Sequence, residues 1–587
     1  MFTKYFINYF TVFLLMISPS LLAEINTNRP PFSLTLSQVE QWSPTSIWAD
    51  KRNVSSVALQ KRIHTDLGNQ KMPLDKKVKV LIAPDGMNNL ANYIEEQSIF
   101  NLYNFTHWSH IDVLNWFAGT ANETVNLPSK PWVETAHRNG VKVIGTVYLS
   151  VAQYGGDVLT VTQLLQQDKQ GGFPLARKLV EIAQFYGFDG WLINPETDLT
   201  QVKNAQGDVI KGQFETKNAA VLGLKMQQFM RYLTEISPEQ MEIHWYDSML
   251  LDGSVKWQNE LNTNNSAFFQ GINQQERYSD AMFMNYWWDG EMVANSHDYV
   301  TKLNRSPYEL YFGADLSPER NAQQIYTHSD WLKNIFSSKD NQALSSIALF
   351  GNDVTYTFTG DEHTPAYSKF RGDKMDYRRF YDSETRLFAG NDLNIYTDDA
   401  DNEWPGIGRY VPAKSTLINL PFSTSFNTGH GLFKARQGKK IAGEWHDISQ
   451  QDILPTWQFA IEGDNKTTIY YDFEYAYQGG SSLAIDSEAS VNSTNIPLYQ
   501  SGFILNSHSK INITYQYQLP TTAVQLWLEM ADGDLISIAL TANSDKWLTK
   551  SFSLASYADR VVSRIGFGIS EHRLNKVSIK IGQMEIH

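Results

Sequence analysis

The chain of 587 residues is long enough for more than one domain, and 42% of its residues are hydrophobic, which suffices to bury sizeable cores. Its formal net charge of -14 argues against a nucleic-acid-binding protein, which would carry a basic patch or stripe. The absence of cysteine excludes disulfides, thiolate catalysis and metal sites built from cysteine.

The first residues are typical of a secretory signal peptide. An apolar run over residues 9–17 follows Lys4, and Ala23 offers a small residue at a cleavage point. The run is shorter than the roughly 20 apolar residues that a membrane-spanning helix needs. We therefore predict a signal peptide over residues 1–23 and a secreted or periplasmic protein, with no stable membrane anchor after cleavage. Residues 24–75 form an N-terminal extension without clear periodicity.

From residue 77 to residue 351, short apolar runs alternate with helical segments. In the segment 174–187, four large apolar residues fall on one helical face, Pro174 suits the first turn and Gly187 suits the end. Apolar strands separated by helices are typical of a parallel sheet covered on both faces. Eight such strands predict an α/β protein with a (β/α)8 barrel, over residues 76–400. The expected strands are 77–84, 111–118, 141–149, 187–194, 242–249, 281–288, 309–316 and 345–351.

Beyond residue 410 the helical periodicity fades and short alternating runs appear between turn residues. This pattern predicts an antiparallel, jelly-roll-like β-sandwich over residues 410–587. Aromatic residues make up 13% of the chain, which fits either rich aromatic cores or sugar binding. The sandwich is accordingly expected either to bind carbohydrate or only to brace the barrel. Its expected strands include 510–519, 524–530, 535–540 and 577–586.

The stretch GFDGWLINPET (187–197) places an amide and a carboxyl where the fourth predicted strand ends. Active sites of (β/α)8 barrels lie at the carboxyl ends of the strands. Residues i and i+2 of an extended chain point the same way, so Asn194 and Glu196 should face one space, about 6 to 7 Å apart. Pro195 fixes its own φ and biases Asn194 toward extended geometry.

One amide and one carboxyl depart from the two carboxylates of the usual glycosidase, and they fit substrate-assisted cleavage. In that reaction the 2-acetamido oxygen of the sugar attacks its own anomeric carbon, which gives a proximity advantage. Glu196 would be the acid and later the base, while Asn194 would hold the acetamide N–H. Taken alone, Asn-x-Glu is a weak signal that a helix cap or a loop hydrogen bond explains as well.

Aromatic and polar residues near other strand ends are candidates for contacts with a sugar. Asn285 and Trp287 share a face of the sixth strand, so Trp287 rather than Trp288 should face the substrate. Asp315 ends the seventh strand and can bond either a sugar hydroxyl or a loop, and Trp108 is either a sugar platform or a core residue. We predict substrate contacts at Trp108, Trp245, Asn285, Trp287 and Asp315.

Other titratable residues are expected to be structural. Asp189 should bond backbone at the barrel end, with support of Glu196 as the alternative, and His137 and His244 should be packed side chains. The histidines lack metal-ligand spacing such as HExxH. We predict no metal and no cofactor.

Ten blocks carry a resemblance to a known family, and they follow one another in the order YNFTHWSHIDVLNWFAG (103–119), PWVETAHRNGVKVIGT (131–146), GFDGWLINPET, HWYDSML (244–250), WQNELN (257–262), FMNYWW (283–288), YFGADL (311–316), FNTGHG (426–431), WHDISQQDILPTW (445–457) and GGSSL (479–483). Together they resemble glycoside hydrolase family 85, the endo-β-N-acetylglucosaminidases, over residues 80–485. Their common order is far more specific than any single block.

The resemblance implies cleavage between the two N-acetylglucosamine residues at the root of an N-linked glycan. It implies a retaining, oxazoline-forming hydrolysis with Glu196 as acid/base and Asn194 as the acetamide-orienting group, and transglycosylation as a further outcome. It also implies that Tyr246 lies near the acetamido group and helps Asn194 to position it. N-linked glycans or glycoproteins are then the expected partners, nucleic acid is not, and the chain is expected to be a monomer.

Three departures from the family pattern concern the loops above the barrel. Pro195 replaces a branched aliphatic residue, Ser150 or Gln153 stands where the family tends to carry an acid, and GADLSPER (313–320) lacks the usual continuation. Because such loops shape the distal subsites, these changes bear on the preferred glycan.

Two other functions compete with this interpretation. A chitinase-like hydrolase of family 18 shares the FDG-type strand but presents Asp two residues before the acid, so Asn194 disfavours it. A non-catalytic glycan-binding protein could keep the barrel, but the presence of Asn194, Glu196 and Tyr246 weighs against lost activity.

Overall fold

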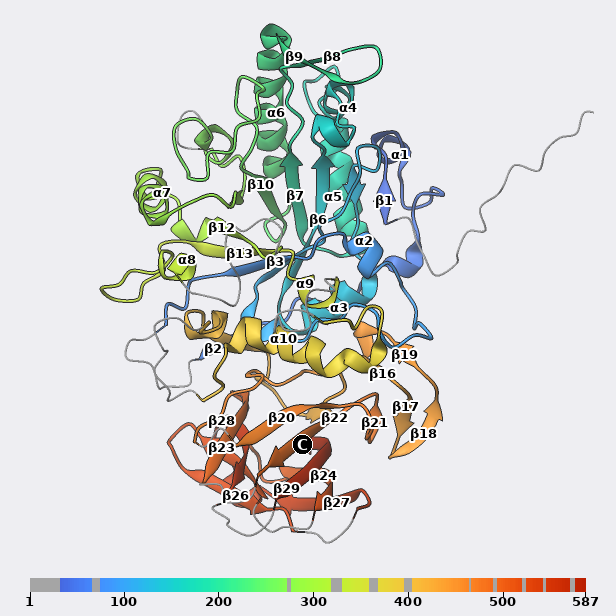
Figure 1. Cartoon of the computed structure of the whole chain (residues 1–587), viewed down its shortest axis with the longest axis vertical. Helices are drawn as coiled ribbons and strands as arrows, with labels where there is room; N and C mark the ends of the chain where they lie inside the picture. Colours follow the sequence, from blue (N-terminus) through green and yellow to red (C-terminus); the bar gives the residue numbers. More distant parts are fainter. Residues whose placement is uncertain are drawn as a thin grey trace, which may run out of the picture.

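Figure 1 shows the chain as a computed structural model, which describes residues 32–587 except 66–73, 272–275, 318–329, 358–367, 395–403, 464–465, 489–492, 520–523, 542–544 and 571–575. The predicted signal peptide therefore lies outside the described residues. Within the described ranges, no helix combines the length and the apolar character that a bilayer crossing requires.

Eight parallel strands of the described chain close into a barrel. The pairing runs β3–β13–β12–β11–β10–β7–β6–β4 and returns to β3, and each of these pairs is parallel. Every one of the eight expected runs contains or overlaps a barrel strand. The strands are β3 (Val80–Ala83), β4 (Val113–Asn115), β6 (Lys142–Leu149), β7 (Gly190–Pro195), β10 (Glu242–Tyr246), β11 (Ala281–Met284), β12 (Leu310–Asp315) and β13 (Ser346–Phe350).

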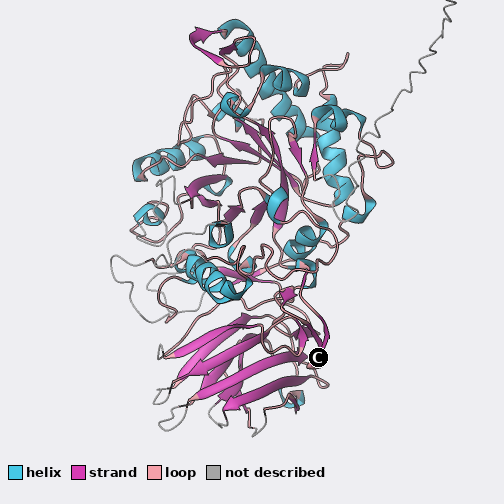
Figure 2. Ribbon diagram, turned by 45° about the vertical axis from the view of Figure 1, so that its right-hand side comes forward, coloured by secondary structure: helices cyan, strands magenta, loops and turns pink. Residues whose placement is uncertain are grey.

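Helices cover the outside of the barrel (Figure 2). The one checked from periodicity is confirmed: α5 (Pro174–Tyr186) buries Leu175, Leu179, Ile182 and Tyr186, and Gly187 ends it in the left-handed region. The remaining helices of the described residues, whether or not they cover the barrel, are α1 (Leu36–Gln41), α2 (Met87–Leu90), α3 (Lys130–Arg138), α4 (Val158–Leu164), α6 (Thr216–Ile236), α7 (Gly290–Lys302), α8 (Asp330–Lys333), α9 (Val354–Thr357) and α10 (Tyr377–Ala389).

The barrel interior is filled by large apolar side chains from alternate positions of the strands, as expected for a packed barrel core. Side chains alternate along each strand between the inside and the outside of the barrel: on β7, Leu192 points inward and Ile193 packs outside. This alternation decides which side chains near the strand ends face the site described below. The interior cluster consists of Leu81, Ala83, Val113, Ile144, Leu192, Tyr246, Ala281, Phe283, Tyr311, Ala348 and Phe350.

Two antiparallel sheets form the C-terminal β-sandwich at the foot of the barrel in Figure 1. One sheet has β20 (Thr467–Asp472), β22 (Ser482–Ser487), β29 (Val577–Ile586), β24 (Lys510–Leu519) and β27 (Leu548–Ser553), with β15 (Phe422–Thr424) also on β29. The other has β23 (Thr494–Gln500), β28 (Val562–Ile569), β25 (Val524–Met530) and β26 (Leu535–Ala539).

Short strands fill the remaining connections and tie distant parts of the chain together. In particular, β14 (Ala413–Ser415) pairs with β2 (Ile63–Thr65) in an antiparallel manner. The others are β1 (Ser33–Leu34), β5 (Val125–Asn126), β8 (Gln201–Lys203), β9 (Val209–Phe214), β16 (His430–Gly431), β17 (Lys434–Arg436), β18 (Lys439–Ala442), β19 (Trp445–His446) and β21 (Gln478–Gly479).

The predicted fold class is thus confirmed: a (β/α)8 barrel followed by an antiparallel β-sandwich. The exact domain limits, 76–400 and 410–587, stay a prediction. Helix α10 runs along the junction between the two bodies in Figure 1.

Candidate functional site

Asn194 lies inside the barrel near the carboxyl end of β7. Its Cα is paired with Tyr148 on β6. Because Leu192 points into the barrel interior, Asn194 two residues later points the same way. The side chain is 3% exposed, and its buried Oδ1 has no hydrogen-bond partner among the described residues. A buried amide oxygen of this kind is an acceptor that lacks a donor.

Glu196 follows directly after β7, in a segment held by hydrogen bonds to neighbouring elements. Its backbone N–H donates to the Leu149 carbonyl at 2.9 Å. The Ser248 hydroxyl donates to the Pro195 carbonyl at 2.9 Å, and the Thr197 hydroxyl donates to the Ser150 carbonyl at 2.7 Å. These bonds fix the residues on both sides of Glu196, whose side chain is partly buried.

Tyr246 comes to the same level on the adjacent strand. The pairing of Trp245 with Ile193 places the next residues, Tyr246 and Asn194, side by side at the end of β10 and β7. Burial raises the pKa of Tyr246 well above its ordinary value, and electrostatic interactions with Tyr286 and Glu196 add to this rise. The Tyr246 hydroxyl donates to Asn285 Oδ1 at 2.8 Å.

Tyr148 faces the same carboxylate from the other side. Burial raises its pKa, the hydroxyl of Ser150 lowers it, and the charge of Glu196 raises it further. Glu196 therefore lies within electrostatic reach of Tyr148 and of Tyr246. The sequence interpretation missed Tyr148, although it lies one residue before the end of the third predicted strand, 141–149.

Two tryptophans are exposed beside this group. Trp287 is 61% exposed, and its backbone N–H donates to Asn259 Oδ1 at 3.1 Å. Trp257 is 41% exposed and hydrogen-bonds with the Tyr246 phenol. Trp257 was not singled out from the sequence, and its signal was its place in the WQNELN block. Both indoles offer the flat apolar surface that a pyranose ring can cover.

Two other predicted sugar contacts lie in the core. Trp245 alternates with Tyr246, so it points outward, where it stacks on Phe268 with ring centres 4.2 Å apart. Trp108 is 1% exposed and packs against Phe105, and its indole N–H donates to Gln451 Oε1 at 2.7 Å. Because both rings are covered by protein, their placement does not favour a contact with sugar.

Asp315 ends β12 but is closed off from the surface. It is 1% exposed, and its Oδ1 accepts the backbone N–H of Ser317 at 3.0 Å. This placement favours the loop bond over the sugar contact.

The residues expected to be structural make bonds at the amino ends of the strands. Asp189 Oδ2 accepts the Val143 N–H at 2.7 Å and lies 2.8 Å from His137 Nε2, while His244 Nε2 lies 3.0 Å from Glu242 Oε2. No group of His, Asp and Glu suited to a metal occurs in the described ranges.

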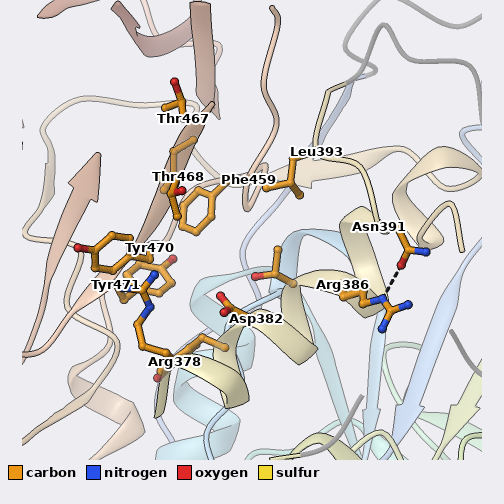
Figure 3. A pocket seen from close by; sticks show the side chains of 14 residues that line it. Arg378, Asp382, Arg386, Asn391, Leu393, Phe459, Thr467, Thr468, Tyr470 and Tyr471 are labelled. Carbon is orange, nitrogen blue, oxygen red and sulfur yellow. Dashed lines mark hydrogen bonds between the residues drawn. The ribbon is translucent and has the colours of Figure 1, made fainter. Parts of the chain in front are cut away.

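A separate groove of about 420 Å³ opens between α10 and β20 (Figure 3). Arg378, Asp382 and Arg386 line it from one side of the helix, and the Arg378 guanidinium lies 3.6 Å from the centre of the Tyr470 ring. None of the predicted site residues lines this groove, so it is distinct from the cluster at the barrel end.

Sequence comparison relates this chain to a known protein family. The sequence model of glycosyl hydrolase family 85 matches residues 87–434. The cytosolic endo-beta-N-acetylglucosaminidase of Mus musculus is 27% identical over 88% of this chain and 61% of its own length, and that of Homo sapiens is 27% identical over 86% and 59%. The chain thus spans about six-tenths of the length of these relatives.

Among solved structures, the glycoside hydrolase domain of Endo-D from Streptococcus pneumoniae R6 superposes with a TM-score of 0.77 and 23% identity. The match covers 94% of this chain and 82% of that domain, which supports the fold.

The relatives also correct one prediction. The chain was expected to be secreted or periplasmic, but the matched relatives from mouse, human, chicken and Arabidopsis are all named cytosolic enzymes. The predicted location is therefore wrong. A short apolar run after one lysine is a pattern of composition, and composition alone was insufficient to assign export.

Proposed function

The chain belongs to glycosyl hydrolase family 85, and from this premise we propose that it is an endo-β-N-acetylglucosaminidase acting on N-glycan cores. The bond cleaved is the β-1,4 linkage between the two core N-acetylglucosamine residues. The reaction retains the anomeric configuration, because the substrate's own acetamido group forms an oxazoline-like intermediate. The names of the relatives support this substrate class.

The unpaired Oδ1 of Asn194 is the observation that carries the proposal. A buried acceptor without a donor costs about 1–3 kcal/mol, so the site gains when a ligand supplies an N–H. The acetamide N–H of a bound sugar is such a donor. Accepting it aligns the acetamide oxygen with the anomeric carbon and favours the positive charge that develops on the acetamide nitrogen as the ring closes.

Glu196 supplies the proton transfers. As the acid it protonates the departing glycosidic oxygen while the acetamide oxygen bonds to the anomeric carbon. As the carboxylate it then takes a proton from the incoming water, which opens the oxazoline and restores the acetamide. A sugar hydroxyl in place of water would give transglycosylation by the same route.

Tyr246 stands between Asn194 and the two exposed indoles, next to where the acetamido group would bind. Trp257 and Trp287 would stack on the sugar rings. Trp108, Trp245 and Asp315 are left out of the substrate contacts because each is at most 1% exposed.

The test is incubation with a high-mannose glycoprotein, followed by mass spectrometry of glycan and protein. We expect free glycan, with one N-acetylglucosamine left on each asparagine. Glu196→Gln should reduce release by roughly 10²- to 10⁴-fold, because the general acid is lost. The control Glu235→Gln alters an exposed residue of α6 and should leave release unchanged. Glycan binding without release by the wild-type protein would instead identify a lectin-like protein and refute the proposal.

A further inference from the structure

We propose that two asparagine amides, Asn285 and Asn259, anchored on Asp247, hold the hydroxyl proton of Tyr246 away from the substrate. The phenol oxygen then faces the sugar as a hydrogen-bond acceptor. This inference rests on the proposed function in one respect, because it assumes that the acetamido sugar binds beside Tyr246.

The orientation of the Asn259 amide is fixed from two sides. Its Oδ1 lies 3.1 Å from the backbone nitrogen of Trp287, and a backbone N–H can only donate. Its Nδ2 points at the Trp257 carbonyl at 3.5 Å, and a carbonyl can only accept. The backbone of Asn259 has a φ of 60°, a left-handed conformation that asparagine adopts more readily than most residues. Swapping O and N would place like against like on both sides.

This orientation determines the next two groups. Asn259 Oδ1 also receives a bond of 2.9 Å from Asn285, so the Asn285 atom that faces it must be the donor, Nδ2. The other end of the Asn285 amide is then the acceptor Oδ1, which lies 2.8 Å from the Tyr246 hydroxyl. The phenol must be the donor in that bond. Its single proton is therefore committed to Asn285.

Asp247 anchors this chain of bonds from beneath. Its carboxylate is fully buried and accepts the backbone N–H of Gln258 at 3.0 Å, that of Asn259 at 2.8 Å and the amide Nδ2 of Asn265 at 3.0 Å. Asn265 cannot turn its amide over, because its Oδ1 already accepts the N–H of Asn262 at 2.9 Å. Both side-chain oxygens of Asp247 thus accept hydrogen bonds, and these bonds fix the backbone that carries Asn259.

The consequence concerns charge in the reaction. The phenol oxygen accepts the indole N–H of Trp257, so once its proton is committed to Asn285 it presents its remaining lone pair to the sugar, and this lone pair stabilises the cationic oxazoline-like intermediate. Turned the other way, the positive end of the O–H dipole would oppose that charge. Asn285 and Asn259 are positioning residues in this scheme, since they act through Tyr246.

The hydrogen bonds that run from Asn259 through Asn285 to Tyr246 form a relay, and the kinetics of four variants test it. Asn285→Leu and Asn259→Ala should each lower kcat for glycan release roughly tenfold, with KM changing less than about threefold, because one orienting hydrogen bond is lost. Asn259→Asp keeps an acceptor for both N–H groups and tolerates the left-handed backbone, so it should recover most of the rate lost in Asn259→Ala. Thr263→Ala, an exposed change in the same loop, is the matched control. The relay would be overturned if Asn259→Asp and Asn259→Ala lost kcat equally. It would also be overturned if neither Asn259→Ala nor Asn285→Leu lost kcat.

Neutron diffraction of the deuterated wild-type protein tests the geometry without reference to activity. The Tyr246 deuteron should lie on the line to Asn285 Oδ1, and a deuteron pointing to the carboxyl end of the barrel would contradict the inference. If the wild-type protein releases no glycan, the proposed function fails, whereas the position of this deuteron still decides the relay.

Discussion

At the scale of single residues, Asn194 and Glu196 have different proposed roles in the reaction, and substitution of Asn194 distinguishes positioning of the acetamide from proton transfer. Asn194→Ala should lower kcat/KM for glycan release by roughly 10²-fold, because the acetamide is no longer held for attack. A preformed sugar oxazoline has already closed its ring, so its consumption should fall less than about tenfold. Both rates can be followed by chromatography of labelled sugars. Equal losses on the two donors would contradict the role given to Asn194.

Strand parity predicted the direction of Asn194, which points inward because it lies two positions after the interior residue Leu192. Tyr246, which belongs to the interior cluster, was expected only from the family resemblance. Parity also decides against Trp245, which is adjacent to Tyr246 and so faces outward. Trp108 precedes its strand, where parity says nothing, and its partner Gln451 comes from a distant part of the chain. No local pattern could have assigned that contact.

At the scale of elements, an aspartate precedes alternate strands and joins each to its neighbour. Asp112, Asp189 and Asp280 stand directly before β4, β7 and β11. Each aspartate donates its backbone N–H to the carbonyl of one residue on the neighbouring strand, and its carboxylate accepts the backbone N–H of that same residue. The partner residues are Val80, Val143 and Ile243, and these N···O distances are all 2.7 to 2.9 Å. The sequence shows the three aspartates before apolar runs, but the pairing becomes visible only when the strands lie in register.

Among these three aspartates, Asp112 also forms ion pairs with two cations. Its carboxylate also binds Arg62 and the buried Lys414, which ties β2 and β14 to the barrel, and these cations lower its pKa although burial opposes the change. Asp112→Ala leaves Lys414 buried without its carboxylate, so we expect unfolding to cost about 3–5 kcal/mol less. Urea unfolding followed by fluorescence measures this. Glu239→Ala, at an exposed site, should change stability by less than about 0.5 kcal/mol.

At the scale of the whole molecule, the two bodies meet over buried aromatic and imidazole rings. His430 receives the hydroxyl of Tyr381 at 2.5 Å and lies 2.8 Å from the Phe100 carbonyl. His446 packs edge-on against Tyr93 and His430, with ring centres 5.4 and 5.1 Å apart. The sequence predicted each body from its own periodicity. It could not predict their docking, because the contacts of His430 with Phe100 and of His446 with Tyr93 join residues more than 300 positions apart and leave no periodic pattern.

This junction should make stability depend on pH. Burial lowers the pKa of His446 to about 3, although the nearby Phe100 backbone acts in the opposite direction, whereas an unfolded histidine titrates near 6.5. Above pH 6.5 both states are neutral. As the pH falls below that value, only the unfolded chain takes up the proton, so stability is lost, by about 2 kcal/mol for this residue at pH 5. Burial raises the pKa of Asp353 and Asp452 to about 6, which acts in the opposite sense, so the informative quantity is the difference between variant and wild type.

His446→Phe keeps an aromatic ring and removes the titration. Between pH 7.5 and pH 5, the variant should therefore gain about 2 kcal/mol in unfolding free energy relative to the wild-type protein, measured by urea unfolding at both pH values. His508→Gln removes an exposed histidine and should leave the wild-type pH dependence unchanged. If His446→Phe and the wild-type protein lose stability in parallel on acidification, the buried imidazole at this junction is not what makes the molecule sensitive to acid.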